Sequence, residues 1–194
     1  GVAVTPEKLA SIASHLRREG AININVVGGD PTPNTYHIIA MMRHLELNVA
    51  QLWNSNMFVS EEGMKLLLDI MDIWLPDLKY GSDDCALRIS KAPNYWEVAT
   101  RNIKIAHDLG GGNVIIRVLV LPNHFECCVK PILEWIGENC PRALTNIMRQ
   151  YRPMWRVRSE PDKFPELNRG PSREEMKKAY ELADKLGVIW RPVS

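Results

Sequence analysis

Polar and charged residues follow several apolar, β-branched runs of the chain. A Gly-Gly-Asp-Pro-Thr segment follows the run 22–27, Asn-Ser-Asn follows the run 49–53, and Asp-Leu-Lys follows the run 73–75. Parallel α/β proteins bind ligands at the carboxyl ends of their strands, so we expect these side chains to meet in one site. The candidate site residues are Gly28, Gly29, Asp30, Pro31, Thr32, Asn54, Asn56, Asp77, Lys79 and Arg117.

The types of these residues determine what they can bind. Two adjacent glycines let the backbone approach a ligand closely, and Asp30 adds a negative charge. Lys79 and Arg117 are suited to a carboxylate or a phosphate, whereas Asp77 and the two asparagines can bind a ribose or an ammonium group. Each feature also has a plain structural explanation, because Gly-Gly-Asp-Pro forms common turns and Lys79 can be a solvated lysine.

The cysteines and histidines do not predict a metal site. Zinc and iron-sulfur loops use cysteines two to four residues apart, and Cys85, Cys127, Cys128 and Cys140 lack that spacing. We expect all four to be structural, with Cys127 and Cys128 pointing in different directions, and no metal ligand in this chain. Their small number favours a reducing, cytoplasmic location. His124 lies just past a strand end, either in the site or in an exposed loop.

Alternating helices and strands must position these residues. Strand patterns occur at 22–27, 49–53, 73–75, 114–121 and 144–148, with a short last strand at 188–190. Helical patterns occur at 5–19, 36–45, 60–71, 82–109, 128–138 and 172–186. The helical region 82–109 divides near Asn94, an expected N-cap. The run 114–121 is almost entirely apolar, as in a parallel strand buried on both faces, so Arg117 within it is conspicuous.

Composition limits the class of protein. The chain has 194 residues, with 24 Lys and Arg against 23 Asp and Glu, so no basic surface for nucleic acid is expected. No apolar run is long enough to span a membrane. No composition break divides the chain, so we expect one domain over 1–194, with a core at 1–151 and an extension at 152–194.

The strand count narrows the fold to an open sheet or a partial barrel. Short connections favour right-handed βαβ units and a parallel α/β class. Five strands are too few for a closed eight-stranded barrel, and the first element is a helix. A βα repeat begins with a strand, and the first residue of this chain is Gly1 rather than an initiator Met. We therefore expect the chain to lack an upstream strand and loop.

Three segments together resemble the radical SAM superfamily. The segment 25–34 (NVVGGDPTPN) resembles its Gly-Gly-Glu-Pro-Thr motif, and 114–124 (VIIRVLVLPNH) resembles its fifth strand. The segment 72–80 (DIWLPDLKY) is similar to the fourth strand of the pyruvate formate-lyase activating enzyme branch. The resemblance covers residues 5 to about 153. It implies a partial (β/α)6 TIM-like barrel whose first strand is missing here, followed by a C-terminal helix.

The resemblance also implies a reaction and roles for residues. The family uses a 4Fe-4S cluster and an electron donor to cleave S-adenosylmethionine (SAM) to a 5'-deoxyadenosyl radical, which abstracts hydrogen from a protein or small-molecule substrate. Residues 28–30 match the motif that takes the SAM amino group, with Asp30 in place of the usual Glu. Residues 54–56 match an Asp-Thr-Asn segment of the activating enzymes, so a neutral Asn54 stands where those enzymes have a charged Asp. Asp77 and Lys79 match residues near the SAM carboxylate and a cation site, and Arg117 matches an arginine directed at the ligand.

The chain departs from the family at the cluster. The Cys-x3-Cys-x2-Cys loop is absent, so we expect the full-length protein to carry it upstream and this chain alone to be inactive. Two alternatives stay open: a Schiff-base lyase or aldolase with Lys79 as nucleophile, and a non-catalytic barrel that only binds a ligand. His124 and Tyr151 align loosely with the family, and residues 152–171 either cover the barrel mouth or form a connector.

Overall fold

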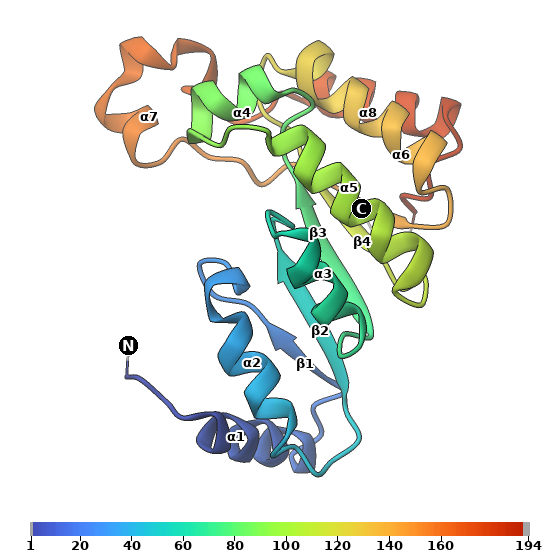
Figure 1. The fold of residues 1–194 in the computed structure, drawn as a ribbon. Coiled ribbons are helices and arrows are strands. Elements are labelled where there is room, and N and C mark those ends of the chain that lie inside the picture. Colours follow the sequence, from blue (N-terminus) through green and yellow to red (C-terminus); the bar gives the residue numbers. More distant parts are fainter. Residues whose placement is uncertain (1, 192–194) are drawn as a thin grey trace.

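The computed structural model describes residues 2–191 and contains a five-stranded parallel sheet (Figure 1). The strands are β1 (Asn23–Val26), β2 (Ala50–Ser55), β3 (Ile73–Leu78), β4 (Ile115–Leu119) and β5 (Leu144–Met148). Each strand pairs with its neighbours in the sequence, in the order β1-β2-β3-β4-β5. This is the strand order of a barrel wall, and it confirms the parallel α/β prediction. The last expected strand is reduced to one bridge between Leu144 and Ile189.

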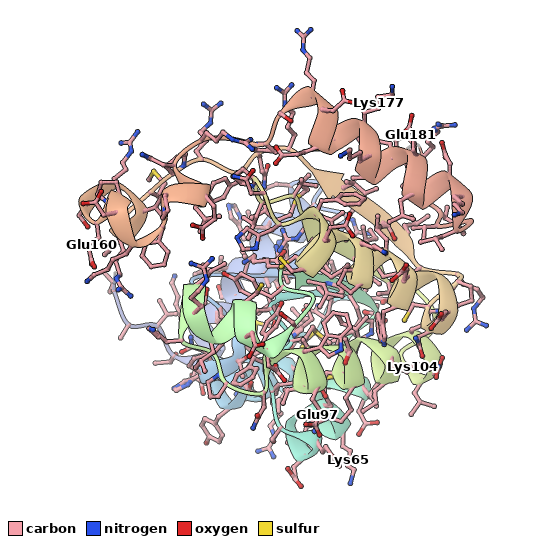
Figure 2. The ribbon with its side chains drawn as sticks, turned by 90° about the horizontal axis from the view of Figure 1, so that it is seen from above. Lys65, Glu97, Lys104, Glu160, Lys177 and Glu181 are labelled. Carbon is pink, nitrogen blue, oxygen red and sulfur yellow. The ribbon has the colours of Figure 1, made fainter. Side chains whose placement is uncertain are left out.

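Helices connect the strands and follow the predicted alternation. They are α1 (Pro6–Arg18), α2 (Thr35–Met42), α3 (Glu61–Leu68), α4 (Asp83–Ser90), α5 (Tyr95–Leu109), α6 (Lys130–Asn139), α7 (Arg156–Ser159) and α8 (Arg173–Lys185). The Thr5 side chain caps α1, and Ser172 forms a capping box with Glu175 at α8. Charged side chains such as Lys65, Glu97 and Lys104 project outward from the helices (Figure 2).

Two predicted helix starts differ in detail from the structure: Asn94 stands at the predicted N-cap position of α5 but does not cap it through its side chain, and α6 begins two residues later than predicted. Asn94 adopts a left-handed backbone with φ 54° and makes no side-chain cap, whereas the Trp96 N–H donates to Asp83 Oδ1 at 2.7 Å. The helix expected from residue 128 is preceded by a π-helical turn, Phe125–Val129. In that turn the His124 carbonyl accepts from the N–H groups of both Cys128 and Val129, at 3.0 and 3.2 Å.

The third strand is longer than its sequence predicts, because it continues through Pro76 to Leu78. Trp74 bridges to Val114, and Asp77 pairs with Arg117 in the same register, so the pairing with β4 is interrupted only around Pro76. A proline has no N–H to donate to a neighbouring strand, which accounts for the gap. The strand therefore tolerates the proline and carries Asp77 to its carboxyl end.

The core lies between the sheet and the helices on one of its faces. Trp53, Trp74 and Ile116 are fully buried there. On the other face Ile115, Arg117 and Leu119 are only half-buried, so the prediction that β4 is buried on both faces was wrong. This open face is the inner wall of the partial barrel. Residues 2–191 include no helix long and apolar enough to cross a membrane.

Candidate functional site

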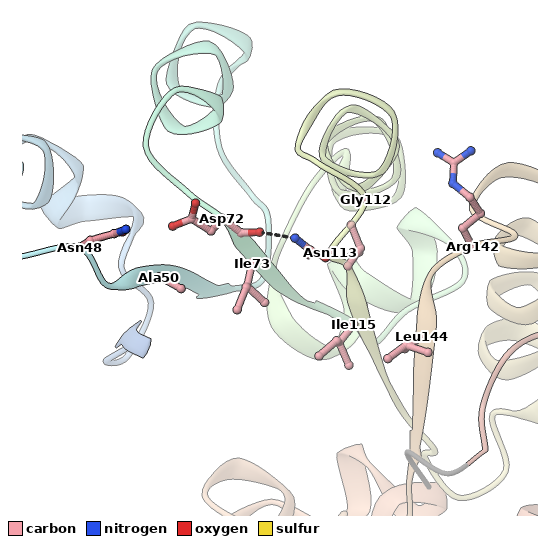
Figure 3. A pocket seen from close by; sticks show the side chains of 10 residues that line it. Asn48, Ala50, Asp72, Ile73, Gly112, Asn113, Ile115, Arg142 and Leu144 are labelled. Atoms are coloured by element: carbon pink, nitrogen blue, oxygen red, sulfur yellow. Dashed lines mark hydrogen bonds between the residues drawn. The ribbon is translucent and has the colours of Figure 1, made fainter. Parts of the chain in front are cut away.

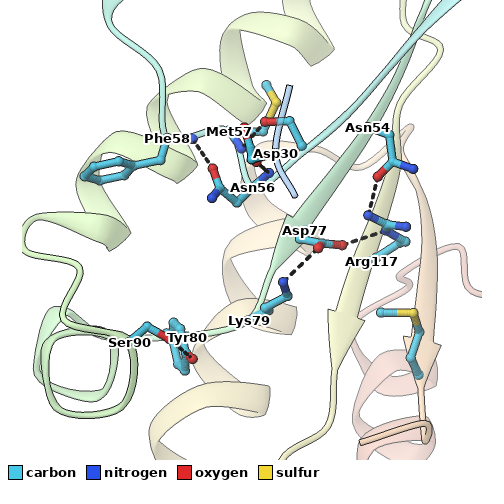
Figure 4. Close-up of polar contacts among 12 residues, drawn as sticks. Asp30, Asn54, Asn56, Met57, Phe58, Asp77, Lys79, Tyr80, Ser90 and Arg117 are labelled. Atoms are coloured by element: carbon cyan, nitrogen blue, oxygen red, sulfur yellow. Dashed lines mark hydrogen bonds and ion pairs between the residues drawn. The ribbon is translucent and has the colours of Figure 1, made fainter. Parts of the chain in front are cut away.

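A small polar cavity of about 180 Å³ lies at the carboxyl ends of β1, β2 and β3 and beside β4. Most of the predicted site residues line it (Figure 4). The lining residues are Val27, Gly28, Gly29, Asp30, Asn54, Ser55, Asn56, Asp77, Lys79 and Arg117. The structure therefore brings together eight of the ten predicted residues, leaving Pro31 and Thr32 outside, and adds Val27 and Ser55.

The glycine loop offers open backbone to the cavity. A Cβ atom built on Gly28 or Gly29 would meet no other atom within 4 Å. The carboxylate of Asp30 is engaged by backbone groups: Oδ1 accepts from the Thr32 N–H at 3.0 Å, and Oδ2 accepts from the Asn56 N–H at 2.9 Å. Asp30 thus ties the loop after β1 to the end of β2 and fixes the position of the glycines.

A chain of polar contacts crosses β2, β3 and β4 (Figure 4). Lys79 Nζ lies 2.9 Å from Asp77 Oδ2, and Arg117 Nε lies 2.6 Å from Asp77 Oδ1. The second contact is short but not aligned as a hydrogen bond, so we treat it as an ion pair. Arg117 Nη2 also donates to Asn54 Oδ1 at 2.5 Å. Asn54 therefore orients the guanidinium without adding a charge.

The charges in the cavity leave an excess of positive charge at one end. Asp77 is shared between Lys79 and Arg117, and the three side chains are partly exposed, at 16, 37 and 24 % respectively. Two cations around one carboxylate can still bind an anion, and a guanidinium and an ammonium are strong donors to carboxylates. The glycine loop and Asp30 line the cavity together with these cations.

Tyr95 positions the end of β3, a role that the sequence did not indicate. Its hydroxyl donates to the Asp77 carbonyl and accepts from the Lys79 N–H, both at 3.1 Å. Burial of the phenol raises the pKa of Tyr95 well above its ordinary value. The hydroxyl is therefore neutral and serves both backbone groups at once. Only its position at the start of a helix was visible in the sequence.

The remaining predicted residues lie elsewhere. Pro31 lines an apolar groove beside α1 and α2, and Thr32 begins a short 3-10 turn. The Tyr151 hydroxyl donates to the Leu167 carbonyl at 2.9 Å, so it holds the segment 152–171. That segment contains α7 and two 3-10 turns.

A larger cavity, of about 580 Å³, opens at the amino ends of the strands (Figure 3). Its polar groups serve the backbone: Asp72 Oδ2 accepts from the Gln51 N–H at 2.8 Å, and Asn113 Nδ2 donates to the Asp72 carbonyl at 3.1 Å. In α/β barrels this end contributes to stability rather than to chemistry. We therefore take the polar cavity at the other end as the candidate site.

The prediction that Cys127 and Cys128 point in different directions was wrong, because both lie in one group. Cys85, Cys127 and Cys128 gather around His124, and their ligating atoms all lie within 4.8 Å of one another. Only Cys140 lies outside this group, buried at the end of α6. His124 is also buried rather than in an exposed loop. The sequence could not reveal the group, because Cys85 lies in α4, far along the chain from the other three residues.

The comparisons with known proteins agree with this architecture. The chain is similar to a domain of pyruvate-formate lyase-activating enzyme from Bacteroides vulgatus, with 15% identity and a TM-score of 0.63 over 87% of this chain and 96% of that one. It also resembles Streptococcus suis SuiB, solved with the precursor peptide SuiA, with 12% identity and a TM-score of 0.66 over 95% of this chain and 40% of SuiB. At these identities the likeness concerns the fold.

Two comparisons at the level of the sequence identify a relative and a family. An uncharacterized protein from Methanocaldococcus jannaschii is 40% identical over 183 residues, which is 94% of this chain and 52% of that protein. The chain thus spans about half the length of this curated relative. The model of the radical SAM superfamily matches residues 1–136, more than half of the chain. The chain belongs to the radical SAM superfamily.

Proposed function

We propose that this chain forms the SAM-binding part of a radical SAM enzyme of the activating-enzyme type. In such an enzyme a reduced 4Fe-4S cluster supplies the electron that splits SAM to methionine and a 5'-deoxyadenosyl radical, which takes hydrogen from a protein or small-molecule substrate. The observation that carries the proposal is the convergence of the glycine loop, Asp77, Lys79 and Arg117 in one cavity. Family membership supports it independently.

The cavity suits the amino-acid end of SAM. Its volume of about 180 Å³ matches a methionyl group rather than the whole molecule, so the adenosyl end would extend along the open face. The ammonium group would bind the glycine carbonyls near Asp30, and the carboxylate would bind Lys79 and Arg117. Asp77 holds both cations in place, and the open space at Gly28 and Gly29 leaves room for the ligand.

The loop that would bind the 4Fe-4S cluster is absent from residues 1–194. None of the four cysteines lies in a Cys-x3-Cys-x2-Cys loop, so no step at a cluster is assigned to the residues of this chain. We propose that the natural full-length protein supplies that loop outside residues 1–194. The activity, the electron donor and the substrate are accordingly proposals for the full-length protein.

A basic cavity beside the site favours an anionic substrate or partner surface. It measures about 870 Å³ and lies at the carboxyl end of β5, where Arg149, Arg152 and Arg158 line it. It opens next to the segment 152–171, which suits a cover over the barrel mouth. We propose that a protein or small-molecule substrate enters here.

The experiment is an assay of 5'-deoxyadenosine formation by the full-length protein after anaerobic iron-sulfur reconstitution. With dithionite and SAM we expect 5'-deoxyadenosine and methionine in equal amounts. The Gly29→Val variant should form much less, because its side chain would fill the cavity, and circular dichroism verifies that the variant is folded. A reconstituted wild-type protein that carries the cluster and forms no 5'-deoxyadenosine would overturn the proposal.

The alternative Schiff-base chemistry is less compatible with this geometry. Lys79 Nζ lies 2.9 Å from Asp77 Oδ2 and is engaged by that carboxylate, whereas a Schiff-base lysine must direct a free amine at the carbonyl carbon of the substrate. Borohydride trapping with carbonyl substrates should therefore give no adduct on Lys79. A trapped adduct at that residue would favour the alternative instead.

A further inference from the structure

Three cysteines and a histidine from three segments meet beside the carboxyl ends of β3 and β4. Cys85 lies in the first turn of α4, His124 follows β4, and Cys127 and Cys128 lie in the π-helical turn that precedes α6. None of these residues lines the proposed SAM cavity. The group is therefore separate from the site described above.

The ligating atoms have the spacing of a single tetrahedral ion. His124 Nδ1 lies 3.2 Å from the Cys127 sulfur and 3.8 Å from the sulfurs of Cys85 and Cys128. A zinc ion with bonds of about 2.3 Å to sulfur and about 2.0 Å to nitrogen would place these atoms about 3.5 Å apart, and two sulfurs about 3.8 Å apart. All four atoms lie within 4.8 Å of one another, so they could converge on one ion.

Hydrogen bonding alone does not account for the arrangement. A single ring nitrogen carries either one proton or one lone pair, so it can form one good hydrogen bond and not three. Three thiols nevertheless surround Nδ1 of His124. A cation at their centre would bind all four atoms at once.

The second ring nitrogen of His124 faces a carboxylate, as in many metal sites. Nε2 is buried, has no hydrogen-bond partner among residues 2–191, and lies 3.7 Å from Glu166 Oε1. Arg88 forms an ion pair with the same carboxylate. A carboxylate behind a ligating histidine fixes the ring orientation and directs the other nitrogen to the metal.

The fold brings the segments unusually close at Gly81. A Cβ atom there would lie 2.7 Å from the Cys128 carbonyl oxygen and 2.8 Å from that of Cys127. Only a glycine therefore allows the loop before α4 to approach the turn that carries the two cysteines. The same loop leads directly to Cys85, so this close approach completes the group.

We propose that Cys85, His124, Cys127 and Cys128 bind one zinc ion through three thiolates and Nδ1 of the imidazole. Binding releases the thiol protons to solvent, and no electron is transferred. Four protein ligands leave no open position, so the site is structural and fastens α4 to the turn before α6. An iron-sulfur cluster would place its ligands on several irons and hold them farther apart than one shared ion does.

The test uses the full-length protein, expressed without added metal, with zinc and iron measured separately by plasma mass spectrometry. We expect one zinc per chain in the wild type and far less in Cys127→Ala and His124→Ala. Cys140→Ala is the matched control, because Cys140 is a buried cysteine outside the group, and it should retain its zinc. Cys127 is exposed, so its replacement leaves the fold intact, which circular dichroism verifies.

Cobalt substitution gives a second readout that does not depend on radical chemistry. Co²⁺ should give the thiolate charge-transfer and visible bands of a tetrahedral sulfur site in wild type and Cys140→Ala, and not in Cys127→Ala. Wild-type protein without zinc and without these bands would overturn the proposal, as would Cys127→Ala holding as much zinc as Cys140→Ala. Iron bound by Cys85 in place of zinc, or a disulfide within the group, would also overturn it. None of these outcomes bears on SAM binding.

Discussion

Asp77 and Arg117 are paired directly across β3 and β4, and their side chains meet on the open face of the sheet, with 2.6 Å between Oδ1 and Nε. Side chains of directly paired residues point to the same face, so the strand register itself builds this contact. Arg117 interrupts an apolar strand because its partner is a carboxylate that also holds Lys79. The paired strands β3 and β4 therefore hold the Asp77 and Arg117 side chains in position in the site.

Replacing Asn54 by Ala should weaken SAM binding without removing a charge. The variant loses the hydrogen bond that orients Arg117, so we expect the Kd for SAM to rise several-fold, equivalent to about 1 kcal/mol. Isothermal titration calorimetry measures the effect. Asn48→Ala, at an exposed position beside the amino ends of the strands, is the control and should bind SAM as the wild type does. Equal Kd values for the two variants would show that Asn54 does not position the guanidinium.

Replacing Tyr95 by Phe should lower the free energy of unfolding by about 1–3 kcal/mol, because the partly buried Lys79 N–H and Asp77 carbonyl both lose their partner. Urea denaturation checks this value. Tyr36→Phe, which changes an exposed tyrosine, should leave the stability within about 0.5 kcal/mol. If the two variants had the same free energy of unfolding, the Tyr95 hydroxyl would not contribute to stability.

Replacing Gly81 by Ala should be far more harmful than the same change at Gly28. At Gly81 the new methyl group would press on two carbonyl oxygens, whereas at Gly28 it meets open space. We expect a loss of about 2 kcal/mol of unfolding free energy at Gly81 and almost none at Gly28. Urea denaturation compares the two, and similar losses would contradict the close approach of the two loops.

Glu175 should make the protein lose stability in acid. Hydrogen bonding to Arg169, aided by the N–H groups of Asn123 and Ser172, lowers the pKa of Glu175 to about 2. Because its folded pKa is lowered, its contribution is complete above the unfolded value near 4.5 and is lost as the pH falls toward 2. Screening reduces the contribution to about 1 kcal/mol. In Glu175→Gln the decline in stability between pH 4.5 and 2 should be smaller, and an unchanged slope would contradict this assignment.

The carboxyl-end site was predictable from the sequence because it depends on topology. Once the strands are parallel and consecutive, residues after each strand meet at one edge, and Gly28, Asp77 and Lys79 needed no further information. The resemblance to the radical SAM superfamily rested on the same segments. The convergence of these residues in one cavity agrees with that prediction, and their roles toward SAM stay predictions.

The features that the sequence did not reveal depend on distances between loops. The group around His124 requires the missing side chain of Gly81 and the π-helical turn, and neither has a periodic signal. Both carboxylate oxygens of Asp30 accept hydrogen bonds from backbone N–H groups, and this arrangement depends on the exact path of the loops. The sequence predicted that the third strand ends before Pro76, because proline disfavours strands. Local propensity does not show that the proline interrupts the pairing with β4 only locally and that the strand continues to Leu78.

Calorimetric titration of SAM into the full-length wild-type protein and its Arg117→Met variant tests the central claim most directly. Methionine keeps the length of the side chain and removes its charge, and Lys65→Met, on the exposed surface of α3, controls for loss of a positive charge. We predict that the Kd rises at least tenfold in Arg117→Met, about 1.4 kcal/mol, and is unchanged in Lys65→Met. Equal SAM binding by all three proteins would contradict the placement of SAM in this cavity.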